Sequence, residues 1–438
     1  PLHIRRGRPD YYSGLLSRAD IDGPLRSGAL RFPYGERLNL SRLAASGSRE
    51  DLNRAERGVA AKARDVDEAW RAGASMQVLH PQHFHEPVWR LLAGAERAFG
   101  ATCGANAYLT PSGFQDRAPH FDDVENFMMQ LEGSRRWRLH RPPAGEEHPL
   151  PRDYSRDFRA AELPPPLAEA LLAPGDLLYV PRGVVRDGRA PGGEAADGKR
   201  STFSHHLSIS TYHKTAWCDL LERALSGALE RAVSESAEFR AGLPLGFLDC
   251  MGSWRDTGGG ANAGAGRAGA VASRESFVRH FRGLVSRLAE FVDLDEVCDE
   301  VGVRFTAQRL PPCRSGEPAA GGAEQEAITP DTGVRWVDAK ALRAMMATDP
   351  EEGVPTVMLF HCHANSREQH MCVDTEAEED VGCLRFDAAT YLPALRALFA
   401  ADGRFLRCGD LPVADEADRV ALCDNLREAL LIELGPVG

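Results

Sequence analysis

The first half of the chain consists of short runs in which apolar and polar residues alternate, separated by Pro and Gly. These runs lie at residues 76–81, 106–111, 126–133, 135–142, 175–181 and 206–212. Alternation is the period of a β-strand with one buried face, and closely spaced short strands indicate a β-sandwich or barrel. Residues 85–100 have apolar side chains at helical spacing instead, which predicts a helix packed beside the strands.

The pattern changes to a helical period near Thr215. Residues 215–236 predict one helix, and residues 275–292 predict a second helix with a continuous apolar seam. The seam is formed by Phe277, Phe281, Leu284, Leu288 and Phe291. Such a seam is typical both of a helix-bundle core and of a dimer interface, and the sequence leaves both open. The glycine-rich residues 257–270 predict a flexible linker.

The last third of the chain alternates strands with helices again. Strands are predicted at residues 356–363 and 381–386, and helices at 390–400 and 416–431, which together indicate a small α+β module of winged-helix type. The predicted domains are a β-domain at 1–213, a helical domain at 214–310, a linker at 311–333 and the α+β module at 334–438.

Composition narrows the functional classes. The formal net charge of −12 disfavours a surface that coats a phosphate backbone and favours a basic protein partner. The ten cysteines contain no Cys-x-x-Cys pair, which suits free thiols inside a cell. No apolar run has the length of about 18 residues that a membrane span needs. Because residue 1 is Pro, we expect the natural N-terminus, with any targeting signal, to be missing.

The segment APHFDDVENF at residues 118–127 carries the first candidate chemistry. If it is a strand, His120 and Asp122 share one face, because side chains at i and i+2 point the same way. An imidazole and a carboxylate on one face supply two corners of the 2-His-1-carboxylate set that holds non-haem Fe(II). A lone His-x-Asp pair is more often ordinary polar structure, so the surrounding sequence has to decide.

That surrounding sequence resembles the JmjC-type ribosomal oxygenases, and most closely their MINA (ribosomal oxygenase 2) branch. The resemblance is carried by residues 106–142, by LLAPGDLLYVPRG at 171–183 and by HHLSISTYHKTAWCDLL at 205–221. It extends to the opening 16 residues and to the short motifs RLPP (309–312), NSREQH (365–370) and LRF (384–386).

The resemblance implies the α+β fold of that family. It consists of a JmjC domain, which is a double-stranded β-helix of cupin type, a helical dimerisation domain and a C-terminal winged helix. The implied activity is Fe(II)- and 2-oxoglutarate-dependent hydroxylation by O₂ of a histidine in a large-subunit ribosomal protein, and histone lysine demethylation has been assigned to the same branch. A homodimer in the nucleus or nucleolus, with a basic protein as substrate, is expected.

Site residues follow by position from the resemblance. His120 and Asp122 match two iron ligands. Asn106, Tyr108, Ser208 and Ser210 match residues that line the 2-oxoglutarate pocket. Arg135 stands where this branch has a Lys that pairs with the distal carboxylate of 2-oxoglutarate, and its guanidinium keeps the positive charge.

The position of the third iron ligand departs from the family pattern. The third iron ligand is a histidine after the motif Pro-Arg-Gly-x-x, and here that position holds Arg186, which has no lone pair for a metal. Two hypotheses remain open. In the first, His206, on the predicted pocket face of its strand, completes the iron site, with its neighbour His205 facing outward, although the resemblance favours His206 as a residue that only lines the pocket beside the usual third ligand. In the second, the chain is a catalytically impaired JmjC scaffold.

Two further readings are weaker. His361, Cys362, His363, His370 and Cys372 invite a zinc site, although their spacing fits no closed finger. A winged helix also suggests DNA binding, but its helix at 415–431 carries more acids than bases, so direct contact with nucleic acid is not expected.

Overall fold

The computed structural model describes residues 1–192, 202–212, 214–253, 274–313, 327–349, 351, 353–371 and 381–437. The chain divides into two compact units, one formed by Pro1–His213 with Val303–Gly438 and the other by Lys214–Gly302. The predicted linker at 257–270, much of the 311–333 linker and Cys372 lie outside the described residues. No helix within the described ranges has the length and apolarity needed to cross a membrane.

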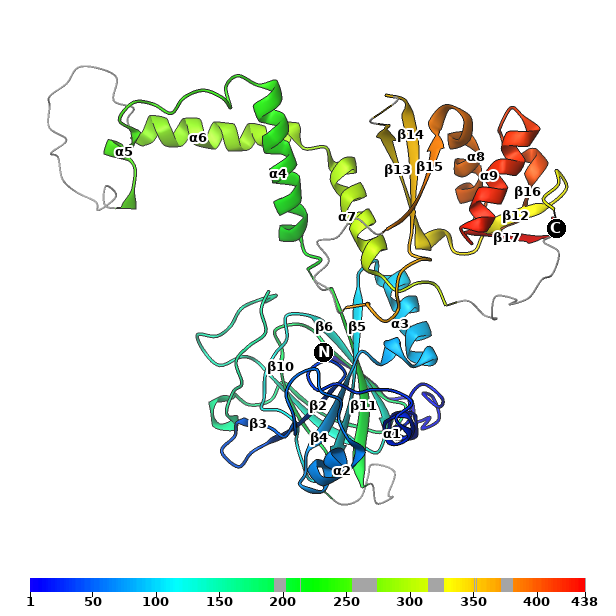
Figure 1. Cartoon of the computed structure of the whole chain (residues 1–438). Helices are drawn as coiled ribbons and strands as arrows, with labels where there is room; N and C mark the ends of the chain where they lie inside the picture. Colours follow the sequence, from blue (N-terminus) through cyan, green and yellow to red (C-terminus); the bar gives the residue numbers. More distant parts are fainter. Residues whose placement is uncertain are drawn as a thin grey trace, which may run out of the picture. The chain divides into compact units, whose positions relative to one another are not determined.

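The N-terminal part of the first unit is built from antiparallel strands (Figure 1). They are β1 (Leu2–Ile4), β2 (Leu38–Leu43), β3 (Arg49–Asp51), β4 (Ser75–Leu79), β5 (Cys103–Pro111), β6 (Glu125–Glu132), β7 (Arg135–His140), β8 (Ala168–Leu172), β9 (Leu177–Val180), β10 (Val185–Arg189) and β11 (Phe203–Thr211). Every run that was predicted as a strand from its alternation overlaps one of them, so that prediction is confirmed.

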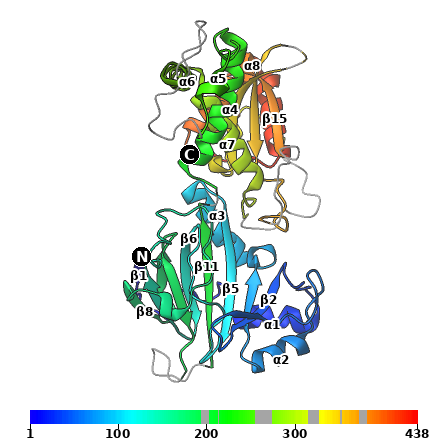
Figure 2. The same ribbon diagram turned by 90° about the vertical axis from the view of Figure 1, so that its left-hand side faces the viewer.

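These strands form two sheets. The larger has the order β1-β9-β6-β11-β5-β4-β2-β3, and the smaller has the order β10-β7-β8. Figure 2 shows β11 lying beside β5, with which it pairs over its whole length. Met128 and Leu178 of the large sheet share a buried cluster with Trp137 and Leu172 of the small sheet. The two sheets therefore pack face to face, as a double-stranded β-helix requires.

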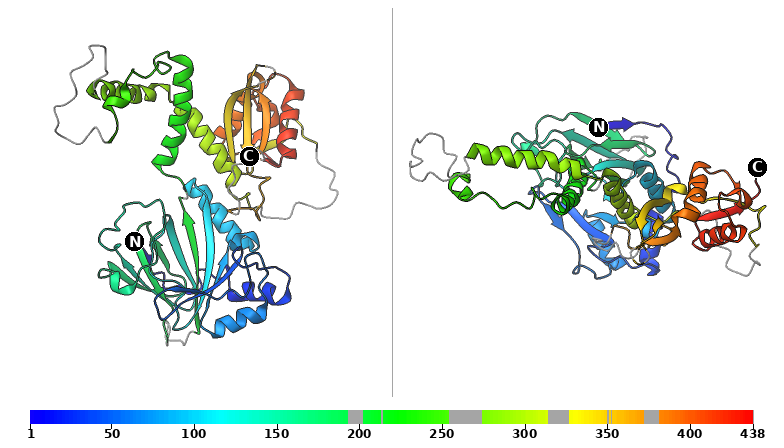
Figure 3. Two further views of the ribbon diagram at one scale, coloured as in Figure 1. Left: turned by 60° about the vertical axis from the view of Figure 1, so that its left-hand side comes forward. Right: turned by 90° about the horizontal axis from the view of Figure 1, so that it is seen from above.

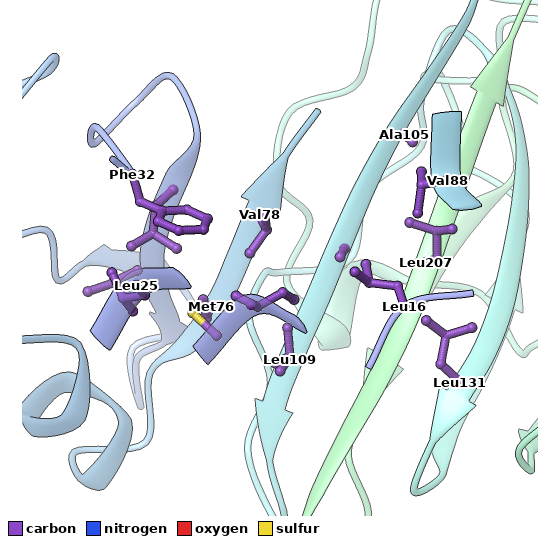
Figure 4. Packing of buried hydrophobic residues seen from close by; sticks show 14 of the residues in the cluster. Leu16, Leu25, Phe32, Met76, Val78, Val88, Ala105, Leu109, Leu131 and Leu207 are labelled. Atoms are coloured by element: carbon purple, nitrogen blue, oxygen red, sulfur yellow. The ribbon is translucent and has the colours of Figure 1, made fainter. Parts of the chain in front are cut away.

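Three helices complete this part: α1 (Arg18–Ser27), α2 (Ala63–Arg71) and α3 (Glu86–Phe99). The side chain and backbone of Ser17 form a capping box with Asp20 that begins α1. The helices share one apolar core with the large sheet, and Leu25, Val88 and Leu109 all belong to it (Figure 4). The predicted helix at 85–100 is confirmed as α3.

The second unit is helical, with α4 (Trp217–Glu235), α5 (Phe247–Cys250), α6 (Arg274–Leu288) and the start of α7 (Leu294–Gln308). Figure 3 shows α4 and α6 as its two long helices. No residue of α6 is buried, and the side chain of Phe281 is 58% exposed. The other four seam residues are half-buried, and Phe277 and Phe291 contact Phe247 and Phe239 of the same unit. Both predicted roles of the seam, helix packing within the chain and a dimer interface, therefore stay predictions.

The C-terminal part carries two three-stranded sheets, with the orders β16-β12-β17 and β13-β14-β15. Its elements are β12 (Gly333–Trp336), β13 (Leu342–Thr348), β14 (Pro355–His361), β15 (Gly382–Asp387), α8 (Ala388–Ala400), β16 (Leu406–Arg407), α9 (Glu416–Glu428) and β17 (Ile432–Gly435). Residues from both sheets and both helices bury one core, which includes Trp336, Leu359, Leu398 and Leu426. The strands and helices predicted here are confirmed.

Candidate active site

His120 and Asp122 lie between β5 and β6, on an extended segment and not within a regular strand as predicted. Their side chains nevertheless point the same way, with Nε2 of His120 3.7 Å from Oδ1 of Asp122. Nδ1 of His120 donates to the carbonyl oxygen of Ala118 over 2.8 Å, so Nε2 carries the lone pair. That nitrogen is buried and has no hydrogen-bond partner among the described residues. This half of a metal site is therefore present.

Arg186 lies directly opposite His120. The two residues form an isolated antiparallel bridge in which the N–H of Arg186 donates to the carbonyl of His120 over 2.9 Å. The guanidinium turns inward: Nη2 of Arg186 lies 2.5 Å from Oδ2 of Asp122. Only 10% of the Arg186 side chain is exposed, against 18% for Asp122. The arginine thus occupies the position of the third ligand and pairs with one of the other two.

This ion pair sets the charge state of the site. Burial opposes ionisation of Asp122, but the neighbouring Arg186 and His120 lower its pKa to about 2. Burial and the charge of Arg186 lower the pKa of His120 to about 3, so its imidazole is neutral at neutral pH. The Nδ2 of Asn126 also donates to Oδ2 of Asp122, over 3.0 Å. Asp122 is therefore already neutralised and hydrogen-bonded by the protein itself.

The residues present do not fit a resident Fe(II). Among the described residues there is no group of three or more His, Cys, Asp or Glu side chains that could hold a metal ion. A divalent cation placed about 5 Å from the Arg186 charge would meet repulsion on the order of several kcal/mol, even at an effective dielectric near 20. The metal would also have to displace Arg186 from Asp122.

His206 does not repair this site. Its ring lies flat against the ring of Tyr108, with centroids 4.9 Å apart, and edge-on to Trp137. Among the described residues it does not join His120 and Asp122 in a metal-binding group, so the predicted ligand set of His120, Asp122 and His206 is not assembled in this structure. His205 points to the other face of the sheet, but that face is covered, and Nδ1 of His205 pairs with Oε1 of Glu132 at 3.0 Å. His205 therefore faces away from the barrel interior as predicted, but it is buried there.

The predicted 2-oxoglutarate residues line the same barrel. Asn106 and Tyr108 lie on β5 opposite Ser208 and His206 of β11. The Oγ of Ser208 donates to Oδ1 of Asn126 over 3.3 Å, which links it to Asp122 through the Asn126 amide. Ser210 lies further along β11 and is half-buried.

Arg135 begins β7 and is 1% exposed. It donates from Nη1 to Oγ1 of Thr110 and from Nη2 to the carbonyl of Gly188, both over 2.9 Å, and Nη2 also pairs with the carboxylate of Asp116. The guanidinium is therefore inside the barrel as predicted, but its charge is already compensated.

Two residues of the site were missed from the sequence. Asn126 joins Ser208 to Asp122, and Asp116 provides the counter-ion of Arg135. The available signal was position, because each lies four residues from a predicted ligand: Asp116 precedes His120 and Asn126 follows Asp122.

The possible zinc residues are separated by the fold. His370 is 4% exposed, and its Nε2 lies 2.8 Å from Oε1 of the buried Glu96 on α3. His361 and His363 instead face each other edge-on at the end of β14. Within the ranges the structure describes, these residues form no metal-binding group.

The barrel with its paired His120 and Asp122 is that of a JmjC domain, and the JmjC domain family model matches residues 77–215. The chain is 34% identical over 442 residues to ribosomal oxygenase 1 of Gallus gallus, covering 98% of this chain and 67% of that protein. It is 28% identical to the bifunctional lysine-specific demethylase and histidyl-hydroxylase NO66 of Dictyostelium discoideum, covering 98% and 77%.

Among solved structures, the crystal structure of the Escherichia coli ribosomal oxygenase YcfD matches with a TM-score of 0.44 at 15% identity, covering 99% of this chain and 94% of that one. On the evidence of its sequence relatives, the chain belongs to the JmjC ribosomal oxygenases, a family of 2-oxoglutarate-dependent oxygenases. The family assignment is confirmed, and the finer placement in the MINA branch stays a prediction.

Proposed function

We propose that this chain is a ribosomal oxygenase homologue that binds a basic segment of a large-subunit ribosomal protein without holding catalytic iron. The observation that carries the proposal is the 2.5 Å ion pair between Arg186 and Asp122 at the position of the metal. Buried ion pairs are expensive to break, because removal of one partner leaves the other charge unpaired in the interior. Displacing Arg186 from Asp122 would therefore be costly, which disfavours metal binding.

The family and the charge balance support the choice of partner. One relative is named a ribosomal oxygenase and another a lysine-specific demethylase and histidyl-hydroxylase. The net charge of −12 speeds encounter with basic polypeptides. We place this function in the nucleus or nucleolus, where ribosomal proteins and histones are both present.

A second candidate is the full activity implied by the family: Fe(II)- and 2-oxoglutarate-dependent hydroxylation of a ribosomal-protein histidine, with histone lysine demethylation as a related possibility. One observation favours it. Nε2 of His120, which carries the free lone pair, lies 3.7 Å from Oδ1 of Asp122, so two of the family's ligands are close together. When bound, the iron would supply oxidative chemistry with O₂ and the keto-acid; in this chain it would require Arg186 to leave Asp122.

We further propose that the protein is a homodimer formed through its helical unit. Large apolar side chains on α4 are exposed at a spacing of four residues, and α6 adds further ones. The exposed residues are Trp217, Leu221, Leu225, Leu229 and Val233 on α4, with Phe281 and Val285 on α6. Contiguous exposed apolar surface of this kind usually marks a protein interface.

The test uses the purified full chain under anaerobic conditions. Iron content is measured after Fe(II) loading with 2-oxoglutarate present, and succinate release is measured after admission of O₂ with histidine-containing peptides from large-subunit ribosomal proteins. We expect sub-stoichiometric iron and no succinate above the blank, together with saturable peptide binding in fluorescence anisotropy. An acidic peptide of equal length is the control. Stoichiometric iron with substrate-dependent succinate would establish the second candidate, and failure to bind any basic peptide would refute the first.

A further inference from the structure

The barrel interior holds a second buried ion pair besides Arg186 and Asp122. The side chain of Arg135 is 2% exposed and that of Asp116 is 16% exposed. Arg135 reaches three segments at once: Thr110 on β5, Asp116 in the loop that follows β5, and the carbonyl of Gly188 on β10. A guanidinium that is buried this completely needs an anion beside it, and Asp116 is that anion.

The interior charges balance without any ligand. Arg135 and Arg186 supply two positive charges, and Asp116 and Asp122 supply two negative ones. Burial alone would raise the pKa of Asp116, but Arg135 holds that pKa below its ordinary value, so the carboxylate is ionised. At the rim, Arg117 faces Asp157 over 3.5 Å and adds no net charge.

The histidines of the interior are neutral. The pKa of His120 is about 3, and burial together with the charge of Arg135 lowers the pKa of His206 well below its ordinary value. A free divalent cation would thus add uncompensated positive charge to the barrel, and a free dicarboxylate would add uncompensated negative charge.

We infer that Asp116 is a built-in anion that occupies the carboxylate-binding position of Arg135 and thereby excludes dicarboxylates such as 2-oxoglutarate from the barrel. The inference rests on the proposed function and deepens it. The proposed function excludes Fe(II) from the barrel, and the inference adds that 2-oxoglutarate is excluded as well. Asp116 is also suited to a mutational test. It lies in a loop, so its charge can be removed without changing a strand of either sheet.

The geometry also shows which groups of Arg135 become available to a ligand when the negative charge of Asp116 is removed. In the Asp116→Asn variant the amide oxygen can still accept from Nη2 of Arg135, but the guanidinium loses its counter-ion. Nε of Arg135 is buried and has no partner among the described residues, so an incoming carboxylate finds a free donor as well as an unpaired charge. Arg and carboxylate groups pair well when two N–H donors are available.

The experiment is calorimetric titration of 2-oxoglutarate and succinate into the full chain in the presence of a metal chelator. We expect no saturable binding to the wild type at millimolar ligand, and affinity at least about tenfold higher for Asp116→Asn, in line with a gained charged hydrogen bond. The matched control is Asp157→Asn, which removes the rim carboxylate beside Arg117 and should behave as wild type. An Arg135→Met/Asp116→Asn variant should lose the gain.

Thermal unfolding supplies the second measurement, since Asp116→Asn leaves a buried cation and will lower the Tm. Succinate should restore the Tm of this variant and leave that of the wild type unchanged. Saturable binding to the wild type, or a folded Asp116→Asn variant with no gain in affinity and no succinate-dependent rise in Tm, would overturn the inference. Iron loading of the wild type is measured separately, so it can refute the proposed function without altering the outcome for Asp116.

Discussion

The imidazole of His206 lies parallel to the phenol ring of Tyr108, with their planes 8° apart and their centroids separated by 4.9 Å. Trp137 meets the same imidazole edge-on at 5.4 Å. An imidazole held between two aromatic side chains cannot rotate toward a metal without losing both contacts. His206 is thus a wall of the pocket, and residue 186 decides whether the barrel can hold a metal.

This relationship leads to a prediction about metal binding. The Arg186→His variant removes the cation beside Asp122 and supplies a third donor, so it should bind Co²⁺ at least about a hundredfold more tightly than the wild type, as expected when a repulsion of several kcal/mol is removed. The visible absorption of bound Co²⁺ reports both affinity and coordination. Adding His206→Phe, which keeps a ring against Tyr108, should leave the affinity unchanged.

Two outcomes of that experiment discriminate between the ligand sets. His120→Ala in the Arg186→His background should abolish the tight site, because it removes one of the three donors. If His206→Phe instead removes it, His206 is a ligand and the pocket rearranges on metal binding.

The exposed apolar side chains of α4, from Trp217 to Val233, predict that the protein is a dimer. Leu225→Arg and Leu229→Arg together place two charges on the apolar face and should convert a dimer into a monomer in light scattering coupled to gel filtration. Glu230→Arg is the matched control, because it also adds an arginine to α4 but projects from a different side of the helix. A wild-type chain that is monomeric at tens of micromolar would contradict the proposed dimer.

The sequence predicts local structure well where one face of an element is buried. The alternation in residues 126–133 and 206–212 identified β6 and β11, and the spacing of Val88 and Leu92 identified α3. The face of each side chain also followed: His120 and Asp122 point the same way although the segment is not a regular strand. Periodicity is a local property, so it transfers directly from sequence to structure.

Contacts between residues far apart in the sequence could not be predicted from local periodicity. Alternation places His205 opposite His206 but does not reveal that His205 is buried and pairs with Glu132, whose carboxylate also accepts from the backbone N–H of Arg18. The inward turn of Arg186 depends on its bridge to His120, and the role of Asp116 depends on Arg135, nineteen positions later. Such pairings arise from the closure of the barrel and not from any local pattern.

The pH dependence of stability should reflect two histidines in the 3-10 turn that precedes α3, His83, which is buried, and His80, which is half-buried. His80 and His83 stack on each other with centroids 5.0 Å apart. Burial, reinforced by neighbouring positive groups such as Arg37, lowers the pKa of each to about 4 from 6.5. Between pH 6.5 and about 4, His80 and His83 bind protons in the unfolded chain but stay neutral in the folded chain. The free energy of unfolding must therefore decrease as the pH falls through this range.

The variant that tests this is His80→Asn/His83→Gln. Asn tolerates the left-handed backbone of residue 80, where φ is 51°, and Gln can donate to the carbonyl of His370 as Nε2 of His83 does. Urea unfolding at a series of pH values should show a shallower loss of stability for the variant than for the wild type between pH 6.5 and 4. Parallel curves would show that the two histidines titrate normally in the folded protein.

Gly188 provides a prediction about the packing that holds Arg135. A Cβ atom added at this position would lie 2.7 Å from Cε3 of Trp137, closer than real side chains allow, and the indole is enclosed in the cluster between the two sheets. Gly188→Ala should therefore lower the free energy of unfolding by about 1–3 kcal/mol, the usual cost of overpacking, in urea denaturation. Gly192→Ala is the control, since its Cβ would meet its nearest neighbour, Cα of Gly113, at 3.7 Å.

Because the carbonyl of Gly188 also accepts from Arg135, displacement of β10 should weaken that contact as well. Equal stability of the two alanine variants would mean that the Trp137 ring does not pack against the backbone of β10.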